Sequence, residues 1–199
     1  MKYYGVKVGA VPGVYDTWEN AKKQVDGYSG AQFKSFHTYK EAEDYVSSKD
    51  CISYNESKSD VVAYTDGSYD PDSGIFAYGA VILIDGKEIT FSRAFFDKEK
   101  ALMRNVVGEI EGAKAIMGYC YSHNIKSVDI YYDYEGIEKW CTGEWRATKK
   151  ETQMYRAYYD AVSRKVNINF IKVKSHSGNK YNDIADSLAK EAVKTMPVL

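Results

Sequence analysis

The sequence lacks the features that mark secreted, membrane-spanning or metal-thiolate proteins. Its three cysteines, Cys51, Cys120 and Cys141, are odd in number and show no metal-ligand spacing, which predicts free thiols in a reducing cytoplasm. No apolar run approaches the roughly 20 residues of a membrane span. Residues 1–5 do not begin the apolar core of a signal peptide. We therefore expect a cytoplasmic protein with no membrane partner and no obligatory protein partner.

The sequence also lacks an excess of one charge sign. Lys and Arg number 27 and Asp and Glu number 28, so the formal net charge is −1. This balance counts against nucleic-acid binding through overall charge, although a local stripe of Lys and Arg can bind phosphates while acids lie elsewhere. Nineteen tyrosines supply many rings that could stack or pack.

A polar segment, residues 48–60, is rich in Ser, Lys and Asp and predicts a linker. It divides a small block, residues 1–47, from a larger one, residues 61–199. The small block predicts an α+β domain with two helices and a small core. Thr17 is the expected N-cap of its first helix, and Thr38 opens a capping box with Glu41. The expected order is strand 3–8, strand 13–15, helix 18–25, strand 32–36, and a helix that begins after residue 38.

The larger block alternates strand and helix patterns after an initial run of strands. Asp85-Gly86 predicts a tight hairpin between the second and third strands. Three antiparallel strands followed by strands that alternate with helices predict an α/β fold with a mixed five-stranded sheet flanked by helices. The expected strands are 61–69, 78–84, 88–95, 128–132 and 167–173, and the expected helices cover 106–120, 153–162 and 184–193.

Four carboxylates lie in four separate segments of the larger block. Asp66 follows Tyr-Thr in a Thr-Asp-Gly-Ser strand, and Glu109 lies early in the first long helix. Asp133 ends a strand-like run, and Asp186 lies ten residues after His176. Carboxylate oxygens that converge from strands and helices are the ligands that Mg²⁺ prefers. The nearby acids Glu111, Glu135, Asp129 and Asp183 are expected to lie away from this site.

The order of these segments resembles ribonuclease H of the type-1 class over residues 61–195. The shared pattern is Thr-Asp-Gly-Ser, the helix Glu, the strand-end Asp, Lys-x-His-Ser-Gly, and Asn-Asp-x-Ala-Asp-x-Leu-Ala-Lys. The resemblance implies a ribonuclease H-like fold and two Mg²⁺ ions per active site, with Mn²⁺ as a substitute. It implies that Asp66 bridges the two ions, that Asp186 completes the water-activating site, and that Glu109 and Asp133 hold the other ion.

The same resemblance implies further roles at the substrate. His176 would assist proton transfer or product release from a Ser/Gly loop. Asn105 matches a position that contacts the RNA strand, while its neighbours Arg104 and Val106 depart from the commoner Thr and Gln. The aromatic pair Trp140 and Trp145, which flank an expected turn over residues 141–144, matches residues that grip the DNA strand; buried packing is the alternative. The Lys-rich protruding helix of some relatives is missing.

Residues 2–47 resemble the N-terminal hybrid-binding domain of eukaryotic-type enzymes of this class, which is related to caulimovirus viroplasmin. The matching segments are Tyr3-Tyr4-Gly5-Val6, Gly13-Val14-Tyr15, Thr17-Trp18 and Gln32-Phe33-Lys34-Ser35-Phe36.

The resemblance implies that Trp18 and Phe33 stack on the DNA strand, that Lys34 contacts phosphate, and that Tyr4 belongs to the same surface. Ser35 replaces the second Lys of the family pair, so weaker and less salt-dependent binding is expected. A purely structural Trp18 is the alternative.

We interpret the chain as an endoribonuclease that hydrolyses the RNA strand of RNA–DNA hybrids by a two-metal-ion mechanism. Two alternatives belong to other classes. One is a hybrid-binding module without catalysis, which would require a broken carboxylate set. The other is a different nuclease or transposase on the same fold, which would lack the Lys-x-His-Ser-Gly loop and the N-terminal block.

Overall fold

The structure is a computed structural model, and it describes residues 2–28, 31–47, 59–174 and 179–197. Within these ranges no helix is long and apolar enough to cross a bilayer. The described ranges leave out residues 48–58, so most of the predicted linker lies outside them.

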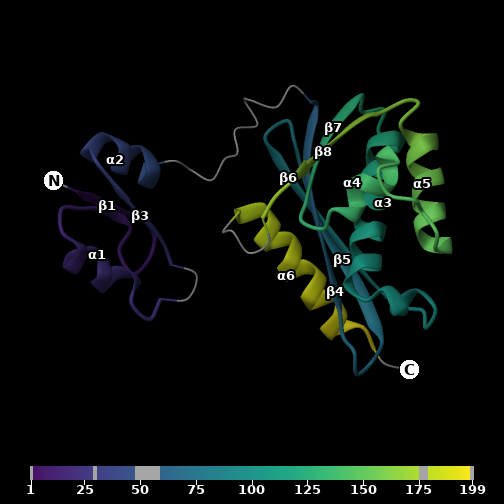
Figure 1. Cartoon of the computed structure of the whole chain (residues 1–199), viewed down its shortest axis with the longest axis horizontal. Coiled ribbons are helices and arrows are strands. Elements are labelled where there is room, and N and C mark those ends of the chain that lie inside the picture. Colours follow the sequence, from purple (N-terminus) through teal and green to yellow (C-terminus); the bar gives the residue numbers. More distant parts are fainter. Residues whose placement is uncertain (1, 29–30, 48–58, 175–178, 198–199) are drawn as a thin grey trace. The chain divides into compact units, whose positions relative to one another are not determined.

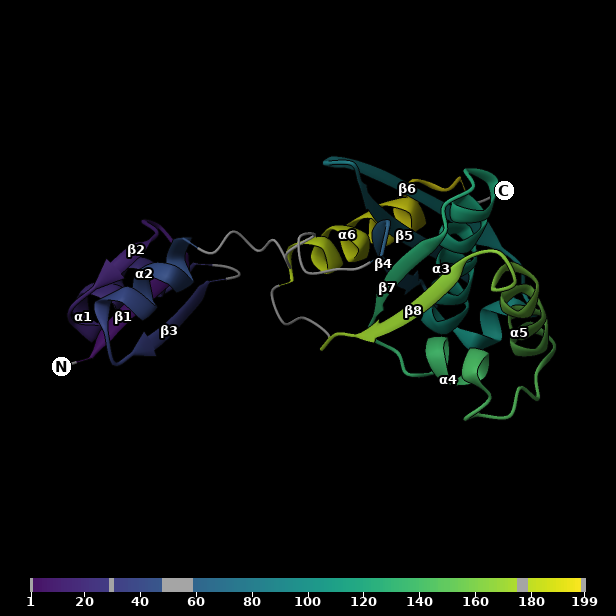
Figure 2. The same ribbon diagram turned by 90° about the horizontal axis from the view of Figure 1, so that it is seen from above.

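The chain forms two compact units, residues 1–53 and residues 54–199. They are called here the N-terminal unit and the C-terminal unit, and each is described by itself (Figures 1 and 2). Ser59 and Asp60, at the end of the predicted linker, are held by the C-terminal unit. Asp60 Oδ2, for example, accepts a hydrogen bond from the backbone N–H of Ser127 (3.0 Å). These two residues are therefore anchored rather than free.

The N-terminal unit is a three-stranded antiparallel sheet with the strand order β2-β1-β3. Both helices begin at the predicted caps. The Thr17 hydroxyl accepts a hydrogen bond from the N–H of Asn20 (3.4 Å), and Thr38 and Glu41 bond each other's backbone N–H groups (3.0 and 3.2 Å). The elements are β1 (Tyr3–Val8), β2 (Gly13–Tyr15), α1 (Trp18–Val25), β3 (Gln32–Phe36) and α2 (Tyr39–Ser47).

The two helices of this unit cover opposite faces of the sheet (Figure 1). A Cβ added to Gly5 would lie 2.9 Å from the ring of Tyr45 in α2, so the residue at this position faces α2. The ring of its neighbour Tyr4 contacts Trp18 of α1, with 5.6 Å between ring centres. Because successive strand residues face opposite sides, β1 divides its side chains between the two helices.

The C-terminal unit contains the predicted mixed sheet, with the strand order β6-β5-β4-β7-β8. Strands β4, β5 and β6 pair antiparallel, and β4, β7 and β8 pair parallel. The expected fold class is confirmed. The elements are β4 (Val61–Tyr69), β5 (Ile75–Ile84), β6 (Lys87–Phe96), η1 (Lys100–Met103), α3 (Asn105–Ser122), β7 (Ser127–Tyr132), α4 (Gly136–Thr142), α5 (Lys150–Val162), β8 (Asn167–Lys172) and α6 (Lys180–Thr195).

The hairpin between β5 and β6 forms at the predicted Asp85-Gly86. Both residues have positive φ values, 49° and 71°, as a two-residue turn of this kind requires. The short elements η1 and α4 are missing from the sequence prediction. Residues 141 and 142 were expected in a turn but form the end of α4, and the turn begins at Gly143, whose φ is 87°. A seven-residue helix contains too few turns for its periodicity to stand out.

Helices α3 and α5 cover one face of this sheet, and α6 covers the other (Figures 1 and 2). Both faces approach the helices closely at glycines of the central strands. A Cβ on Gly67 would lie 2.3 Å from the carbonyl oxygen of Asn105 in α3. A Cβ on Gly79 would lie 2.0 Å from the carbonyl oxygen of Ala185 in α6. Since Gly79 is the register partner of Asp66, the glycines bring both helices to the same level of the sheet.

Candidate active site

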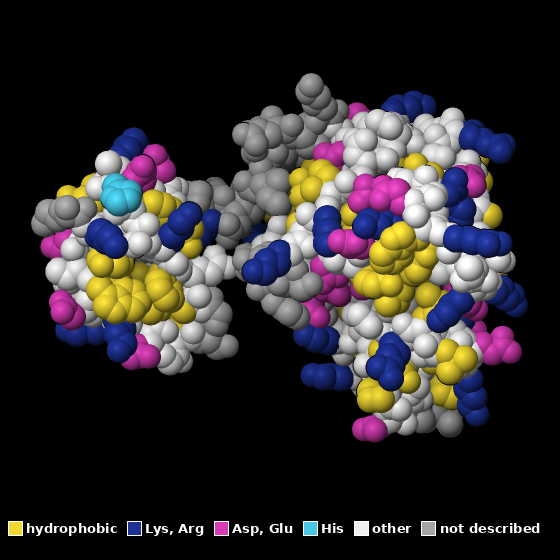
Figure 3. Space-filling view, viewed as in Figure 1, with side chains coloured by type: hydrophobic (Ala, Val, Ile, Leu, Met, Phe, Trp, Pro, Cys, Tyr) yellow, Lys and Arg dark blue, Asp and Glu magenta, His cyan; other side chains and the backbone are white. Residues whose placement is uncertain are grey.

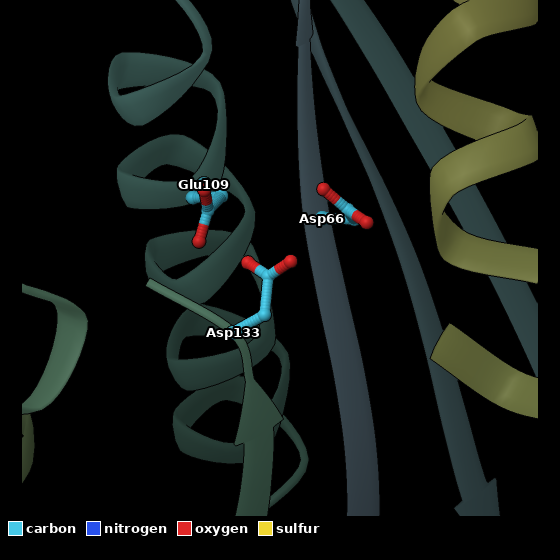
Figure 4. Close-up of side chains that lie close together, drawn as sticks. All are labelled: Asp66, Glu109 and Asp133. Atoms are coloured by element: carbon cyan, nitrogen blue, oxygen red, sulfur yellow. The ribbon is translucent and has the colours of Figure 1, made fainter. Parts of the chain in front are cut away.

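Three of the four predicted carboxylates meet where β7 ends, beside the central strand β4 of the C-terminal sheet. Asp66 lies on β4, Glu109 lies in the second turn of α3, and Asp133 directly follows β7. One carboxylate oxygen from each lies within 4.8 Å of the others. Figure 4 shows the three side chains converging from these elements. This group could hold a metal ion.

The local fold explains why these residues meet. Strands β4 and β7 are parallel neighbours with Tyr64 paired to Tyr131, so Asp66 and Asp133 follow the pair at the same end of the sheet. Gly67 removes the side chain that would hold α3 away, because its Cβ would lie 2.6 Å from the backbone nitrogen of Glu109. The small residue in the Thr-Asp-Gly-Ser segment therefore has a packing role.

The site is largely buried. Asp66 is 8% exposed and Glu109 is 1% exposed, whereas Asp133 is half-buried. Asp66 Oδ1 accepts a hydrogen bond from the backbone N–H of Gly67 (2.7 Å). Among the described residues, Glu109 Oε2 is buried without a hydrogen-bond partner. A buried carboxylate oxygen is costly unless it is bonded, protonated or bound to a cation.

Burial and mutual repulsion disturb the ionisation of the cluster. Burial, followed by the charges of Asp133 and Asp186, raises the pKa of Asp66 to about 7. Burial, followed by the charges of Asp133 and Asp66, raises the pKa of Glu109 well above its usual value. Like charges that share a site favour the protonated form of one or more members. The cluster therefore favours either protons or cations.

The fourth carboxylate, Asp186, lies on α6, the helix that covers the face of the sheet opposite α3. Its charge contributes to the raised pKa of Asp66, but it is not part of the 4.8 Å group. Lys190, one turn further along α6, lies 2.6 Å from Asp186 Oδ2. This ammonium partly neutralises Asp186.

Asn182, one turn before Asp186, is 4% exposed, and its Oδ1 has no hydrogen-bond partner in the described part of the chain. No role was predicted for this residue from the sequence. Its place in the Asn-Asp-x-Ala-Asp segment, four residues before a predicted ligand, was the available signal.

The donor set fits a hard divalent cation. All the donors are carboxylate oxygens, without imidazole or thiolate among the described residues of the cluster, and Mg²⁺ and Mn²⁺ suit such ligands. A bound cation would give the unpaired Glu109 oxygen a partner and would lower the raised pKa of Asp66.

The neighbouring acids are engaged elsewhere, as expected. Glu111 forms ion pairs with Lys100 (3.4 Å) and Lys114 (2.9 Å) on the outer side of α3. Glu135 pairs with Lys139 (2.7 Å), which, together with Lys172, lowers its pKa to about 2.

Asp129 Oδ1 accepts hydrogen bonds from Ser59 (2.6 Å) and Asn169 (2.9 Å). Asp183 is exposed on α6.

The predicted substrate residues of the C-terminal unit lie near the start of α3 and around α4. Asn105 is exposed at the first position of α3. Trp140 and Trp145 are 6.0 Å apart between ring centres, and Tyr134 contacts both rings. Trp145 is 37% exposed and Trp140 is half-buried. Trp140 also packs against the main hydrophobic core cluster of this unit, as the packing alternative expects, whereas Trp145 is the more exposed of the two rings.

The predicted N-terminal binding residues divide between two faces of the sheet. Tyr4, Trp18 and Phe33 form a continuous aromatic cluster, with 5.6 and 5.3 Å between successive ring centres, and Trp18 and Phe33 are 40% and 45% exposed. Lys34 follows Phe33 on β3 and therefore faces the other side, where its Nζ lies 5.7 Å from the ring centre of Phe36. Figure 3 shows a hydrophobic patch with Lys and Arg around it on the visible face of this unit.

His176, the remaining predicted site residue, lies outside the described residues.

Comparisons with known families agree with this architecture. A family profile described as RNase H matches residues 58–194, and one described as Ribonuclease H1 N-terminal domain matches residues 2–46. A ribonuclease H from Caldanaerobacter subterraneus subsp. tengcongensis is 34% identical over 144 residues, covering 67% of this chain and 91% of the relative. A ribonuclease H from Wolbachia pipientis wMel is 29% identical over 146 residues, covering 69% and 97%.

Solved structures share the fold of the C-terminal unit. RNase H1 from the archaeon Halobacterium salinarum NRC-1 superposes with a TM-score of 0.58 at 21% identity, covering 68% of this chain and 98% of that one. LC11-RNase H1, solved in complex with an RNA/DNA hybrid, superposes with a TM-score of 0.54 at 19% identity, covering 67% and 96%.

The raised pKa of Asp66 predicts how the metal-free protein responds to pH. The folded protein holds this proton up to about pH 7, whereas the unfolded chain loses it near the ordinary value of 3.8. The folded state thus binds more protons in this interval, and stability falls as the pH rises through it. Asp66→Asn removes this titration, so at pH 8 in EDTA it should raise the free energy of unfolding by roughly 2–4 kcal/mol.

Urea unfolding at pH 4 and pH 8 measures the effect, which should nearly vanish at pH 4. Asp183→Asn, on the exposed side of α6, is the control and should change stability little at either pH. A wild type that is more stable than Asp66→Asn at pH 8 in EDTA would contradict the repulsion that we describe.

Proposed function

Because the chain belongs to the ribonuclease H family, we propose that it is an endonuclease that hydrolyses the RNA strand of RNA–DNA hybrids by a two-metal-ion mechanism. The observation that supports the mechanism is the group of Asp66, Glu109 and Asp133, of which the first two are buried, together with the charge of Asp186, which acts on Asp66. The hybrid bound to LC11-RNase H1 supports the substrate by analogy of fold.

Two Mg²⁺ ions, or Mn²⁺ in their place, would supply an activated water and a stabilised leaving oxygen. We assign Asp66, on which the charges of both Asp133 and Asp186 act, as the carboxylate shared by both sites. Asp186 would complete the site of the water, and Glu109 and Asp133 would hold the side of the leaving group. Burial of Asp66 and Glu109 excludes bulk water and strengthens every charge interaction there.

The surrounding residues would position the substrate. Asn105, at the exposed first position of α3, would meet the RNA strand where the 2′-hydroxyl distinguishes RNA from DNA. Trp140 and Trp145 would lie against the DNA strand. His176, which follows β8 in the sequence, would move a proton or help release the product.

The N-terminal unit would raise affinity for the hybrid. The cluster of Tyr4, Trp18 and Phe33 offers exposed rings for stacking, which is worth roughly 1–3 kcal/mol per base. Lys34, which faces away from these rings, would have to reach phosphate around the edge strand β3. We assign residues 1–47 to this hybrid-binding domain, 48–60 to the linker and 61–199 to the catalytic domain, in a cytoplasmic protein.

Asp66→Asn should abolish cleavage while hybrid binding persists, because the amide keeps the shape of the side chain but not its charge. We expect a loss of at least about 10³-fold, since cation-assisted activation supplies much of the rate. The measurement is cleavage of matched RNA–DNA, RNA–RNA and DNA–DNA duplexes in Mg²⁺, with Asp183→Asn as the control of equal charge change.

Only the RNA of the hybrid should be cut. Cleavage of DNA–DNA would favour another nuclease of this fold, and binding without cleavage by the wild type would favour an inactive hybrid-binding module. Wild-type turnover by Asp66→Asn would refute the assignment of the carboxylates.

Trp18→Ala should weaken hybrid binding by the full chain about ten- to a hundred-fold, the equivalent of one lost stack. Cleavage at saturating hybrid should change little, because the carboxylates belong to the other unit. Tyr39→Ala removes a ring of similar exposure (53%) outside the Tyr4–Trp18–Phe33 cluster and serves as the control. A folded Trp18→Ala that binds like the wild type would return Trp18 to a structural role.

A further inference from the structure

A short connection between β7 and α4 holds one of the three carboxylates. Strand β7 ends before residues 133–135 and α4 begins after them, so Asp133 belongs to this connection (Figure 4). Burial raises the pKa of Glu109 most, and the backbone N–H of Tyr134 is among the groups that oppose this rise. The position of the connection therefore affects two members of the carboxylate group.

A hydrogen bond spans this connection. The hydroxyl of Tyr132, the last residue of β7, donates to Oε2 of Glu138 in the first turn of α4. Tyr132 is 1% exposed, and Glu138 is half-buried. Because a buried hydroxyl without a partner is costly, this bond ties the end of β7 to the start of α4.

The sheet fixes the tyrosine end of this bond. The carbonyl of Tyr132 accepts a hydrogen bond from the N–H of Val173 (2.8 Å), just beyond β8. The ring of Tyr132 lies in the main core cluster of the unit, with its centre 6.1 Å from that of Phe170. The hydroxyl is thus a fixed point beside the carboxylate group.

Two further hydrogen bonds hold α4, and both join it to α5. The carbonyl of Ile137 accepts a bond from the hydroxyl of Tyr155 (3.0 Å), and the carbonyl of Trp140 accepts one from Nη1 of Arg156 (3.1 Å). The bond that spans the connection differs from these two, because it joins α4 to β7. It therefore sets where the helix begins relative to the strand that leads to the carboxylate.

The connection also has ion pairs on its outer side. Glu135 pairs with Lys139 (2.7 Å) and with Lys172 of β8, and the side chain of Glu135 is 40% exposed. Ion pairs in contact with water contribute little to stability. The hydrogen bond of the buried tyrosine is therefore the stronger constraint on residues 133–135.

We propose that the hydrogen bond from Tyr132 to Glu138 sets the position of Asp133 for metal binding, so that Tyr132 and Glu138 are positioning residues of the catalytic site. The inference rests on the proposed function, because it requires Mg²⁺ at the carboxylates. Residues that orient the ligands of a metal are typically worth roughly 10- to 100-fold in metal affinity or activity. Without the bond, the connection would keep its outer ion pairs but lose its buried support.

The test compares variants of the full chain that remove the bond with one that keeps it. Tyr132→Phe removes the donor and Glu138→Ala removes the acceptor, whereas Glu138→Gln keeps an oxygen that can accept. Glu144→Ala, at an exposed acid just after α4, is the control for the loss of charge. Tyr159→Phe, whose ring also packs against Phe170, is the control for the loss of a hydroxyl.

Calorimetry without substrate measures the affinity for Mg²⁺, and cleavage of hybrid measures kcat and KM. Tyr132→Phe and Glu138→Ala should each weaken Mg²⁺ binding and lower kcat about tenfold, with little change in the KM for hybrid. Glu138→Gln and both controls should match the wild type. The double variant of Tyr132→Phe and Glu138→Ala should be no worse than either single variant, because the two residues act as a unit.

Several outcomes would overturn the proposal in variants that thermal unfolding shows to be folded. Unchanged Mg²⁺ affinity in Tyr132→Phe would remove the role of the bond, and this variant keeps the buried ring, so it decides the matter even where Glu138→Ala does not fold. An equal loss in Glu138→Gln and Glu138→Ala would assign the effect to charge. Additive losses in the double variant would show that the two residues act separately.

A rise in KM at unchanged Mg²⁺ affinity would also overturn the proposal, because the bond would then act on the rings of Trp140 and Trp145. A wild type that binds Mg²⁺ but does not cut the hybrid would instead refute the proposed function. The Mg²⁺ affinities of the variants would still decide whether the bond positions Asp133.

Discussion

Mutual repulsion among buried carboxylates is the constraint on which the C-terminal unit depends. Asp66, Glu109 and Asp133 are held with oxygens within 4.8 Å of one another, although burial and like charge raise the pKa values of Asp66 and Glu109. The parallel pairing of β4 with β7 and the close contact at Gly67 keep them together. The packing energy of two core layers around the sheet thus maintains a site that its own charges oppose.

Because of the same repulsion, different residues must supply catalysis and affinity for the substrate. A site crowded with negative charge repels the phosphates of a nucleic acid, and the net charge of the chain, −1, offers no general compensation. Contacts away from the carboxylates must therefore supply binding. The structure offers exposed aromatic rings in the N-terminal unit and the rings around α4. Figure 3 shows basic and acidic side chains interspersed on the visible face of the C-terminal unit.

The long elements are predicted well from the sequence, and three of the four carboxylates that it singles out lie together in the structure, because both kinds of feature leave strong local signals. Caps at Thr17 and Thr38, the Asp85-Gly86 turn and the helical repeat of α3 each depend on neighbours in the chain. What depends on tertiary contact was not predicted: the short helices η1 and α4, and the buried Asn182. Phe33 and Lys34 face opposite sides of the sheet because side chains alternate along a strand. The sequence was sufficient to predict this, but the prediction followed the family motif, in which the two residues are simply adjacent.

Proton release on cation binding tests most directly whether cations relieve this repulsion. Calorimetric titration of the full chain with Mg²⁺ at pH 7, in two buffers of different ionisation enthalpy, measures the protons released. With the pKa of Asp66 raised to about 7, we predict a binding enthalpy that depends on the buffer, a dependence that shrinks as the pH rises, and a smaller proton release for Asp66→Asn. Equal enthalpies in both buffers at pH 7, with Mg²⁺ bound, would contradict this prediction.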